Sequence, residues 1–225
     1  LNFAGKIYFL FWDTDIDMVF LTGKSQPLRL GFDFSRNLRS NWEIHGELSL
    51  FKDLEQKVVL ENGSIHTEIT DSIRYLLGIR CLTEAETTYI MEYYHNGAGF
   101  DKVEFGDFYS LVDIGYDRYL LFGDADQIKQ AAALSSYQGF TPMTDYLFLR
   151  IMQKDAFGVL YMTPAATVIV NLLDGSASIA PEMTYKGITN MELRLKAAIL
   201  LGGKGNEFGE KPNKWRLELR ARYFF

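Results

Sequence analysis

Hydrophobic and polar residues alternate along most of this chain, which is the period that places successive side chains on opposite faces of a β-strand. In PLRLGFDFS (27–35) leucine and phenylalanine alternate with charged or small residues, and KWRLELRARYFF (214–225) sets an apolar stripe against charged residues. We predict strands near residues 5–12, 14–22, 27–35, 41–50, 72–81, 88–94, 143–154, 158–173, 175–187, 191–200 and 214–225. The pattern therefore predicts an all-β fold class with antiparallel, up-and-down strands.

The connections between these strands are alternately short and long. Short turns are expected at 37–40, 83–86, 154–157 and 187–190, and longer or glycine-rich links at 53–69, 97–142, 173–176 and 202–213. Transmembrane β-barrels show this asymmetry, with tight turns on the periplasmic side and larger loops outside. The same assignment puts the C-terminus on the periplasmic side and the N-terminus outside. Because single-chain bacterial barrels have an even number of strands, we expect about 11–12 strands here, in the C-terminal part of a larger barrel.

The beginning of the sequence agrees with that expectation. LNFAGKIYFLFW contains neither an initiator methionine nor a signal-peptide cleavage site. We therefore expect a processed form or part of a longer polypeptide.

The segment 97–142 interrupts the alternation. Apolar residues recur there at mostly helical spacing, and Asp124 is a candidate N-cap before the alanine-rich stretch DQIKQAAALSS. We expect two or more short helices in a long loop that is extracellular or luminal. Three roles are open: a cover packed over the barrel mouth, a constriction that sets selectivity, and a docking site for another protein.

Three features favour a lipid-covered sheet over a soluble β-barrel, whose strands also alternate. The expected strands exceed the ~5–6 residues that are most common in soluble sheets. Their polar positions carry many full charges, and their apolar positions end in aromatic residues such as Trp42, Trp215 and Tyr223. Aromatic residues at strand ends are typical of membrane-interface girdles. No apolar run reaches the roughly 18 residues that predict a spanning helix.

The last twelve residues, KWRLELRARYFF, resemble the C-terminal assembly signal of Gram-negative outer-membrane β-barrels. Phe225 matches the terminal aromatic residue and Tyr223 the hydrophobic position two before it, although family members often have glycine where this chain has Arg220. The stretch from about residue 25 also looks like the C-terminal part of uncharacterised porin-like proteins of proteobacteria. The resemblance implies a single transmembrane β-barrel domain over 1–225, the bacterial outer membrane as its location, and the barrel-assembly machinery as a partner.

If the apolar stripe faces lipid, the other face of each strand points into the barrel. The residues that we expect to line a pore are Arg29, Asp33, Glu43, His45, Glu47, Arg74, Arg80, Arg150, Glu192, Arg194, Lys196, Arg216, Glu218, Arg220 and Arg222. Buried charges have to pair or line water. The N-terminal group is mostly acidic and the C-terminal group mostly basic, so a transverse field across the pore and salt-bridge ladders within the wall are both compatible with the pattern.

Composition excludes several other functions. The net charge of −6 gives no basic footprint for nucleic acid, and the single cysteine, Cys81, excludes intramolecular disulfides and cysteine-cluster metal sites. There is no haem-attachment motif, so we predict no cofactor. His45, His66 and His95 lie on separate segments without a serine nucleophile motif, which argues against an enzyme. His45 with Glu43 or Glu47 shares one strand face, but a wall network is favoured over a metal site.

These observations lead to two functional hypotheses from different classes. The first is a porin-like channel of the outer membrane for passive diffusion of small polar or charged solutes. The second is a structural barrel, acting as a scaffold or sheath for a partner such as a lipoprotein or a multihaem cytochrome. A soluble β-barrel that binds a ligand is a third reading.

Overall fold

The computed structural model of the chain describes residues 1–60, 64–138 and 141–225. These residues form β1 (Asn2–Phe11), β2 (Thr14–Gly23), β3 (Gln26–Arg39), β4 (Trp42–Val59), β5 (Ile65–Leu82), β6 (Thr87–Asn96), α1 (Lys102–Phe122), α2 (Asp126–Gln138), β7 (Asp145–Gln153), the short 3-10 helix η1 (Ala156–Gly158), β8 (Met162–Asn171), β9 (Ala177–Ile188), β10 (Met191–Leu201) and β11 (Trp215–Tyr223). The all-β prediction is confirmed, and each predicted strand has a counterpart.

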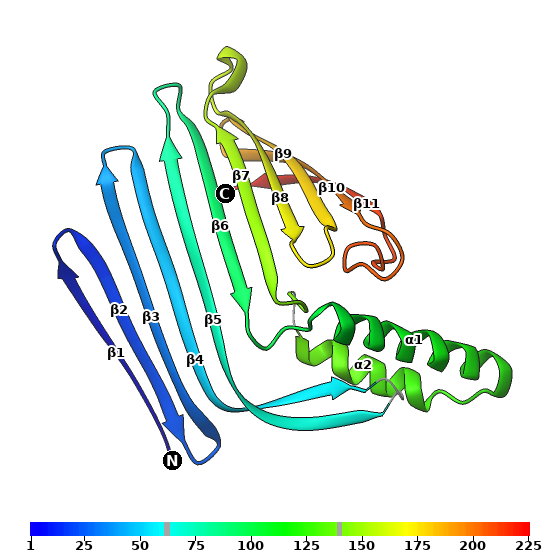
Figure 1. Cartoon of the computed structure of the whole chain (residues 1–225). Coiled ribbons are helices and arrows are strands. Elements are labelled where there is room, and N and C mark those ends of the chain that lie inside the picture. The colour runs from blue at the N-terminus through cyan, green and yellow to red at the C-terminus, as the bar shows by residue number, and fades with distance from the viewer. Residues whose placement is uncertain (61–63, 139–140) are drawn as a thin grey trace.

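The described residues build one antiparallel sheet of eleven strands in sequence order, from β1 to β11. The sheet curls, so that β9, β10 and β11 lie behind β7 and β8 (Figure 1). It is not closed: within the described part of the chain, the outer edges of β1 and β11 pair with no other strand. Because each strand reverses the direction of its neighbour and the count is odd, β1 and β11 run in the same direction.

The connections collect at two opposite edges of the sheet. One edge, here the turn edge, carries the links 12–13, 40–41, 83–86, 154–161 and 189–190. The other, the loop edge, carries 24–25, the link between β4 and β5, 97–144, 172–176 and 202–214. The predicted asymmetry is present, with two exceptions. The link 24–25 is short, and residues 158–161, which we expected within a strand, belong to a longer connection that contains η1.

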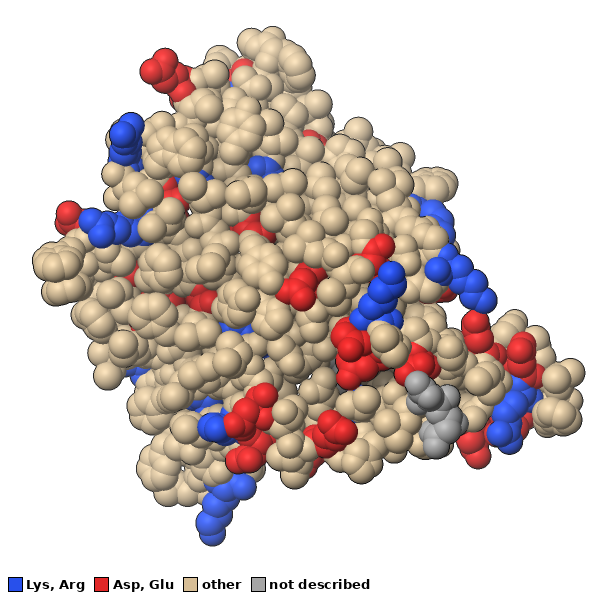
Figure 2. All heavy atoms as spheres, viewed as in Figure 1, with Lys and Arg blue, Asp and Glu red and all other residues tan. Residues whose placement is uncertain are grey.

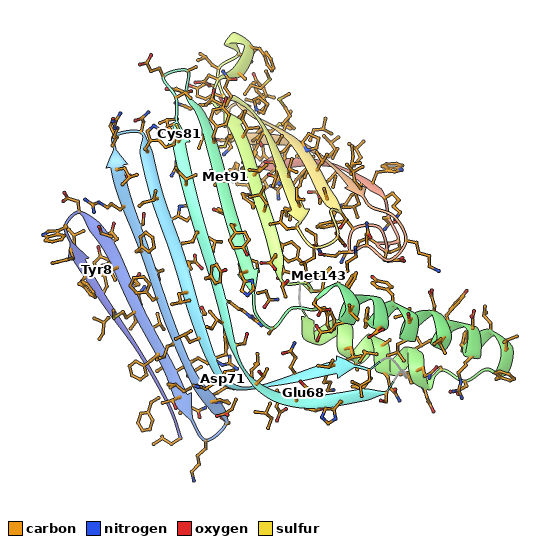
Figure 3. The ribbon with its side chains drawn as sticks, in the orientation of Figure 1. Tyr8, Glu68, Asp71, Cys81, Met91 and Met143 are labelled. Carbon is orange, nitrogen blue, oxygen red and sulfur yellow. The ribbon has the colours of Figure 1, made fainter. Side chains whose placement is uncertain are left out.

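The prediction of a long link at 53–69 is wrong, because β4 and β5 extend through most of this segment as a long hairpin. Only 61–63 of that prediction lie outside the described residues. The reason is a β-bulge between Phe51 and Leu54, where Asp53 has a positive φ of 47° and the register shifts. Asp71 on β5 accepts a hydrogen bond from the Asp53 backbone N (3.2 Å) and pairs with Lys52 (Figure 3). A bulge resets the phase of the alternation, so the pattern beyond it resembles a loop.

The predicted helices are present as α1 and α2, which form a hairpin at the loop edge (Figure 1). The expectation that they would be short is wrong for α1, which has 21 residues. Asp101 caps α1 in a capping box with Glu104, and Gly123 ends the helix in the left-handed conformation, with φ 70°. Asp124 Oδ1 accepts a hydrogen bond from the backbone N of Asp126, 3.0 Å away, at the start of α2. The carbonyl of Ala125 accepts the first hydrogen bond of α2, from Lys129 N, so Asp124 lies one residue before the N-cap position that we predicted for it and stabilises the beginning of α2 from there.

The small buried core gathers around this hairpin. Leu111 of α1 and Leu134 of α2 pack with Val59, from the end of the β4–β5 hairpin. A second cluster joins Phe105 of α1 to Met143, which lies where the chain returns to the sheet (Figure 3). The helices therefore pack on the loop edge of the sheet.

The apolar side of the strands has no such cover. Large hydrophobic side chains remain well exposed there, for example Ile7 at 60%, Leu77 at 54% and Leu219 at 78%. Over the strands, most of the surface seen in Figure 2 is uncharged, and charges collect around the helices and at strand ends. The accessible surface is 14608 Å², compared with about 10,500 Å² expected for a compact soluble monomer of this mass.

Candidate functional site: the polar face of the sheet

The strand register places all fifteen predicted pore-lining residues on one face, here called the polar face. Asp33 is opposite Glu47, Glu43 is opposite Arg80, and the chain of pairings continues through Arg150 to the last strands. On β10 and β11, Glu192 is opposite Arg222 and Arg194 is opposite Arg220. The other face, here called the apolar face, carries the Leu, Ile and aromatic residues of the alternation. Their role in lining a pore stays a prediction.

Across β7 to β10, the polar face is braced by ion pairs that join strands. Glu182 on β9 pairs with Arg194 on β10, and its other oxygen lies 3.9 Å from Arg150 Nη2 on β7. Arg150 also donates a hydrogen bond to the Thr167 hydroxyl at 2.8 Å. Two guanidinium groups, one carboxylate and one hydroxyl thus connect four strands. The sequence pattern found the arginines but missed Glu182 on β9 and Thr167 on β8.

Closer to the turn edge, Glu192 is the centre of a second network. Its carboxylate lies 3.2 Å from Lys186 Nζ and 3.5 Å from Arg220 Nη2. Arg216 and Glu218 on β11 also pair, at 2.7 Å. In the basic sector on the last strands, Arg194, Arg216 and Arg220 therefore pair with carboxylates within the sheet.

A third network crosses β4, β5 and β6. Arg80 Nη1 lies 3.5 Å from Glu43 Oε2, and His45 Nε2 lies 3.2 Å from Glu92 Oε1. His45 Nδ1 is 3.8 Å from Glu43 and has no hydrogen-bond partner. The partner of His45 across the sheet is Glu92, which the less regular alternation of β6 concealed. In the described ranges, no group of three His, Cys, Asp or Glu side chains converges to hold a metal ion.

The remaining predicted residues are not neutralised. Among the described residues, six have no oppositely charged side chain within the 4.0 Å limit of an ion pair: Arg29, Asp33, Glu47, Arg74, Lys196 and Arg222. Arg29 and Arg74 instead flank one ring, that of Phe51, at 5.5 and 4.9 Å from its centroid. Phe51 stands at a polar-face position, where an aromatic residue was not expected. Extending the alternation by one period, from Ser49 to the residue two positions later, would have placed Phe51 on the polar face.

The loop edge brings a buried carboxylate to the end of the polar face. Glu207, in the 202–214 loop, is 1% exposed and accepts hydrogen bonds from the Tyr146 hydroxyl at 2.7 Å and the Asn171 side chain at 2.8 Å. Its backbone N donates to Asp174 Oδ2 at 2.7 Å, which holds the loop against the β8–β9 connection. Burial raises the pKa of Glu207. Nothing in a glycine-rich loop pattern indicated this contact.

The helical hairpin is joined to the same loop. Lys204 Nζ lies 3.0 Å from Asp113 Oδ2 of α1. Burial, together with the charges of Glu210 and Glu207, raises the pKa of Tyr109 to about 12. The hairpin therefore contacts both the β4–β5 hairpin and the 202–214 loop, so it lies across the loop-edge end of the polar face.

The apolar face ends in aromatic residues at both edges. At the loop edge, Tyr75 stacks on His95 at 5.0 Å, and His95 Nδ1 lies 2.8 Å from Asp145. At the turn edge, Tyr223 and Phe225 meet edge to face at 5.4 Å. His95 is thus part of a strand-end aromatic cluster. Neither helix in the described part of the chain is long and apolar enough to cross a membrane.

Comparisons with protein-family models, with curated protein sequences and with solved structures find no match to this chain.

Proposed function

We propose that the chain forms the wall of a transmembrane β-barrel in the bacterial outer membrane, and that it acts as a porin-like channel for passive diffusion of small polar or charged solutes. The observation that carries the proposal is the opposition of the two faces. Large hydrophobic side chains stay exposed on one, while charged networks line the other. A lipid bilayer is the partner that covers the first, and water in the lumen is the medium that suits the second.

Energetics support this assignment. Soluble monomers rarely leave contiguous apolar patches larger than a few hundred Å², whereas here the uncovered face extends across the sheet from Ile7 of β1 to Leu219 of β11. The strands contain 9 to 18 residues, and a tilted strand needs about 9–11 to cross the hydrocarbon layer. Each strand is therefore long enough to span.

Closure of such a barrel has a defined topology. Because β1 and β11 run in the same direction, a barrel with every neighbouring pair antiparallel needs an odd number of further strands between them. Further strands of the same polypeptide or of a partner meet this requirement. A direct β1–β11 seam would be parallel.

The position of the helices favours a channel over a barrel plugged by its own chain. The hairpin packs on Val59, Phe100 and Met143 at the loop edge, beyond the ion-paired stretch of the strands. It is placed to narrow the entrance. The length of the polar face between the two edges is left to solvent.

Single-channel recording in a planar bilayer tests the proposal, using the detergent-solubilised chain with a salt gradient. We expect discrete conductance steps, with a reversal potential that reports which wall sector governs selectivity. A folded, inserted protein that never conducts would contradict the channel and support the second candidate. Stable solubility of the folded chain without detergent would contradict both.

The second candidate, a scaffold or sheath for a lipoprotein or multihaem cytochrome, is favoured by one observation. The C-terminal half of α1 exposes a cluster of large hydrophobic residues outside the sheet: Tyr116, Tyr119, Leu120, Leu121 and Phe122. Leu121 and Phe122 are 74% and 78% exposed. Copurification of a partner with the wild type, lost in a Leu121→Ser/Phe122→Ser variant that conducts normally, would establish this role.

A further inference from the structure

The polar face contains a pocket of about 320 Å³ whose two ends carry opposite charge. Its floor is Gly31 on β3, which stands between Val19 of β2 and Ser49 of β4 and has no side chain to fill the space. Asp33 and Glu47 lie toward the turn edge of the pocket, and Arg29 lies toward the loop edge. The inference drawn from it rests on the proposed function, since it concerns a solute in the lumen.

The acidic end has excess negative charge. Asp33 and Glu47 are direct cross-strand partners, an arrangement of like charges that destabilises a sheet. Asp17, on the next strand, is opposite Asp33 and pairs with Lys6 at 3.0 Å, and its Oδ1 is buried without a partner. Throughout the described residues, no cationic side chain reaches Asp33 or Glu47 within ion-pair distance. A cationic group in the pocket would relieve this repulsion.

At the basic end of the pocket, the hydrogen-bond donors of Arg29 stay available to a ligand. The guanidinium of Arg29 lies over the Phe51 ring, and Arg74 approaches the same ring from β5. A cation–π contact stabilises the charge without using the in-plane N–H donors of the guanidinium. Those donors match a carboxylate, which Arg binds through two parallel hydrogen bonds. The wall offers none to Arg29 in the described part of the chain.

The separation of the two ends defines the class of ligand. Arg29 and Asp33 are four residues apart on one strand, so their Cα atoms are about 13 Å apart, and both residues line the pocket on either side of Gly31. A solute with a carboxylate at one end and an ammonium at the other bridges this distance. We propose that the pocket is a binding subsite for short zwitterionic peptides, with the carboxylate at Arg29 and the ammonium at Asp33 and Glu47.

Gly31 supplies a selective way to test the subsite. A Cβ added at Gly31 would meet Val19 Cβ at 3.6 Å, an ordinary contact, and the residue has no positive φ. Gly31→Leu therefore fills the pocket while the wall keeps its fold. Gly106→Leu, in an open position of α1 away from the pocket, is the matched control.

The experiment is titration calorimetry of the full, detergent-solubilised chain with three probes: triglycine, N-acetyl-triglycine without the ammonium, and triglycine amide without the carboxylate. We expect triglycine to bind, each analogue to bind about tenfold more weakly or worse, Gly31→Leu to abolish binding, and Gly106→Leu to leave it unchanged. Equal binding of triglycine and the acetylated probe would reduce the site to an anion site and overturn the proposal. Absence of binding, or binding that survives Gly31→Leu, would also overturn it.

Conductance measured on the same preparation separates this proposal from the channel. If the protein conducts but does not bind triglycine, the subsite proposal is rejected and the channel proposal stands. If the protein does not conduct but binds triglycine, and Gly31→Leu abolishes this binding, the subsite proposal is supported and the channel proposal is rejected.

Discussion

The helical hairpin and the strands of this protein meet the same physical requirement in different ways. Around the hairpin, apolar side chains are buried against each other: Leu111 and Leu134 are each 1% exposed. On the strands, apolar side chains of the same type, such as Leu77 at 54%, are left outside. The hairpin buries these side chains between its two helices and against Val59, at the end of β4. Within the described residues no element covers these strand side chains; in the proposed function, lipid is the cover.

Truncation of the helical core is expected to have the largest effect. Leu111→Ala leaves a cavity among Val59, Ala131 and Leu134, and such a change costs about 2–5 kcal/mol. The loss should appear as faster amide hydrogen exchange in α1 and α2, with the strands unchanged. Ile114→Ala, at a half-exposed position of the same helix, should alter exchange little. Equal destabilisation of the sheet by Leu111→Ala would mean that the two regions share one core.

A charge on the apolar face is the next test. Leu77→Arg should destabilise the protein in lipid vesicles, lowering its free energy of unfolding by about 2–4 kcal/mol, which is the cost of a cation facing the bilayer centre. Leu76→Arg, one residue away on the polar face and opposite Glu47, should be tolerated. The measurement is urea-dependent folding into vesicles. If both variants folded equally well, the apolar face would have to be in water, and the comparison between hairpin and strands would fail.

The sequence alone predicted most of the secondary structure in both regions, the strands and the helical hairpin. Alternation located the strands, and the change to helical spacing after residue 97 located α1 and α2. The β4–β5 extension was missed because the bulge at Asp53 reverses which residues face which side. A period-2 pattern is read locally, and it carries no information about a phase shift that a bulge introduces.

The candidate site was predictable in part. Period-2 spacing determines which residues share a face, so the fifteen polar-face residues were found together. Their pairing was not predictable, because it depends on register between strands: Glu182 meets Arg150 only through β8, which lies between them. Glu207 depends on how a loop docks, which has no sequence period. Phe51 was missed because an aromatic residue among charges does not fit a simple polar-versus-apolar reading.

The pH response of the 202–214 loop should be smaller than the effect of Leu77→Arg. Because burial raises the pKa of Glu207 above its ordinary value, about 4.3, the docked loop favours the protonated carboxyl. Its stabilisation is complete at low pH and is lost as pH rises through the raised pKa. Hydrogen-exchange protection of 203–210, corrected for intrinsic rates, should therefore fall as the pH rises from the ordinary glutamate pKa, about 4.3, through the raised pKa of Glu207. Glu207→Gln should flatten the profile, and Glu210→Gln should not; a wild-type profile without slope would contradict the buried-carboxyl account.

The exposed contact between the two loop-edge segments should matter least. Lys204 and Asp113 are 3.0 Å apart, with side chains 83% and 58% exposed. The hydrogen bond and charge of Asp113 raise the pKa of Lys204, so the contact is complete below the ordinary lysine pKa, about 10.4, and weakens only above it. Asp113→Asn should change the rate at which protease nicks 202–214 by less than about threefold, and added salt should remove the difference. A large, salt-resistant effect would mean that this pair, and not the buried Glu207, holds the loop to the helices, and the hairpin would then owe its position to surface charge instead of packing.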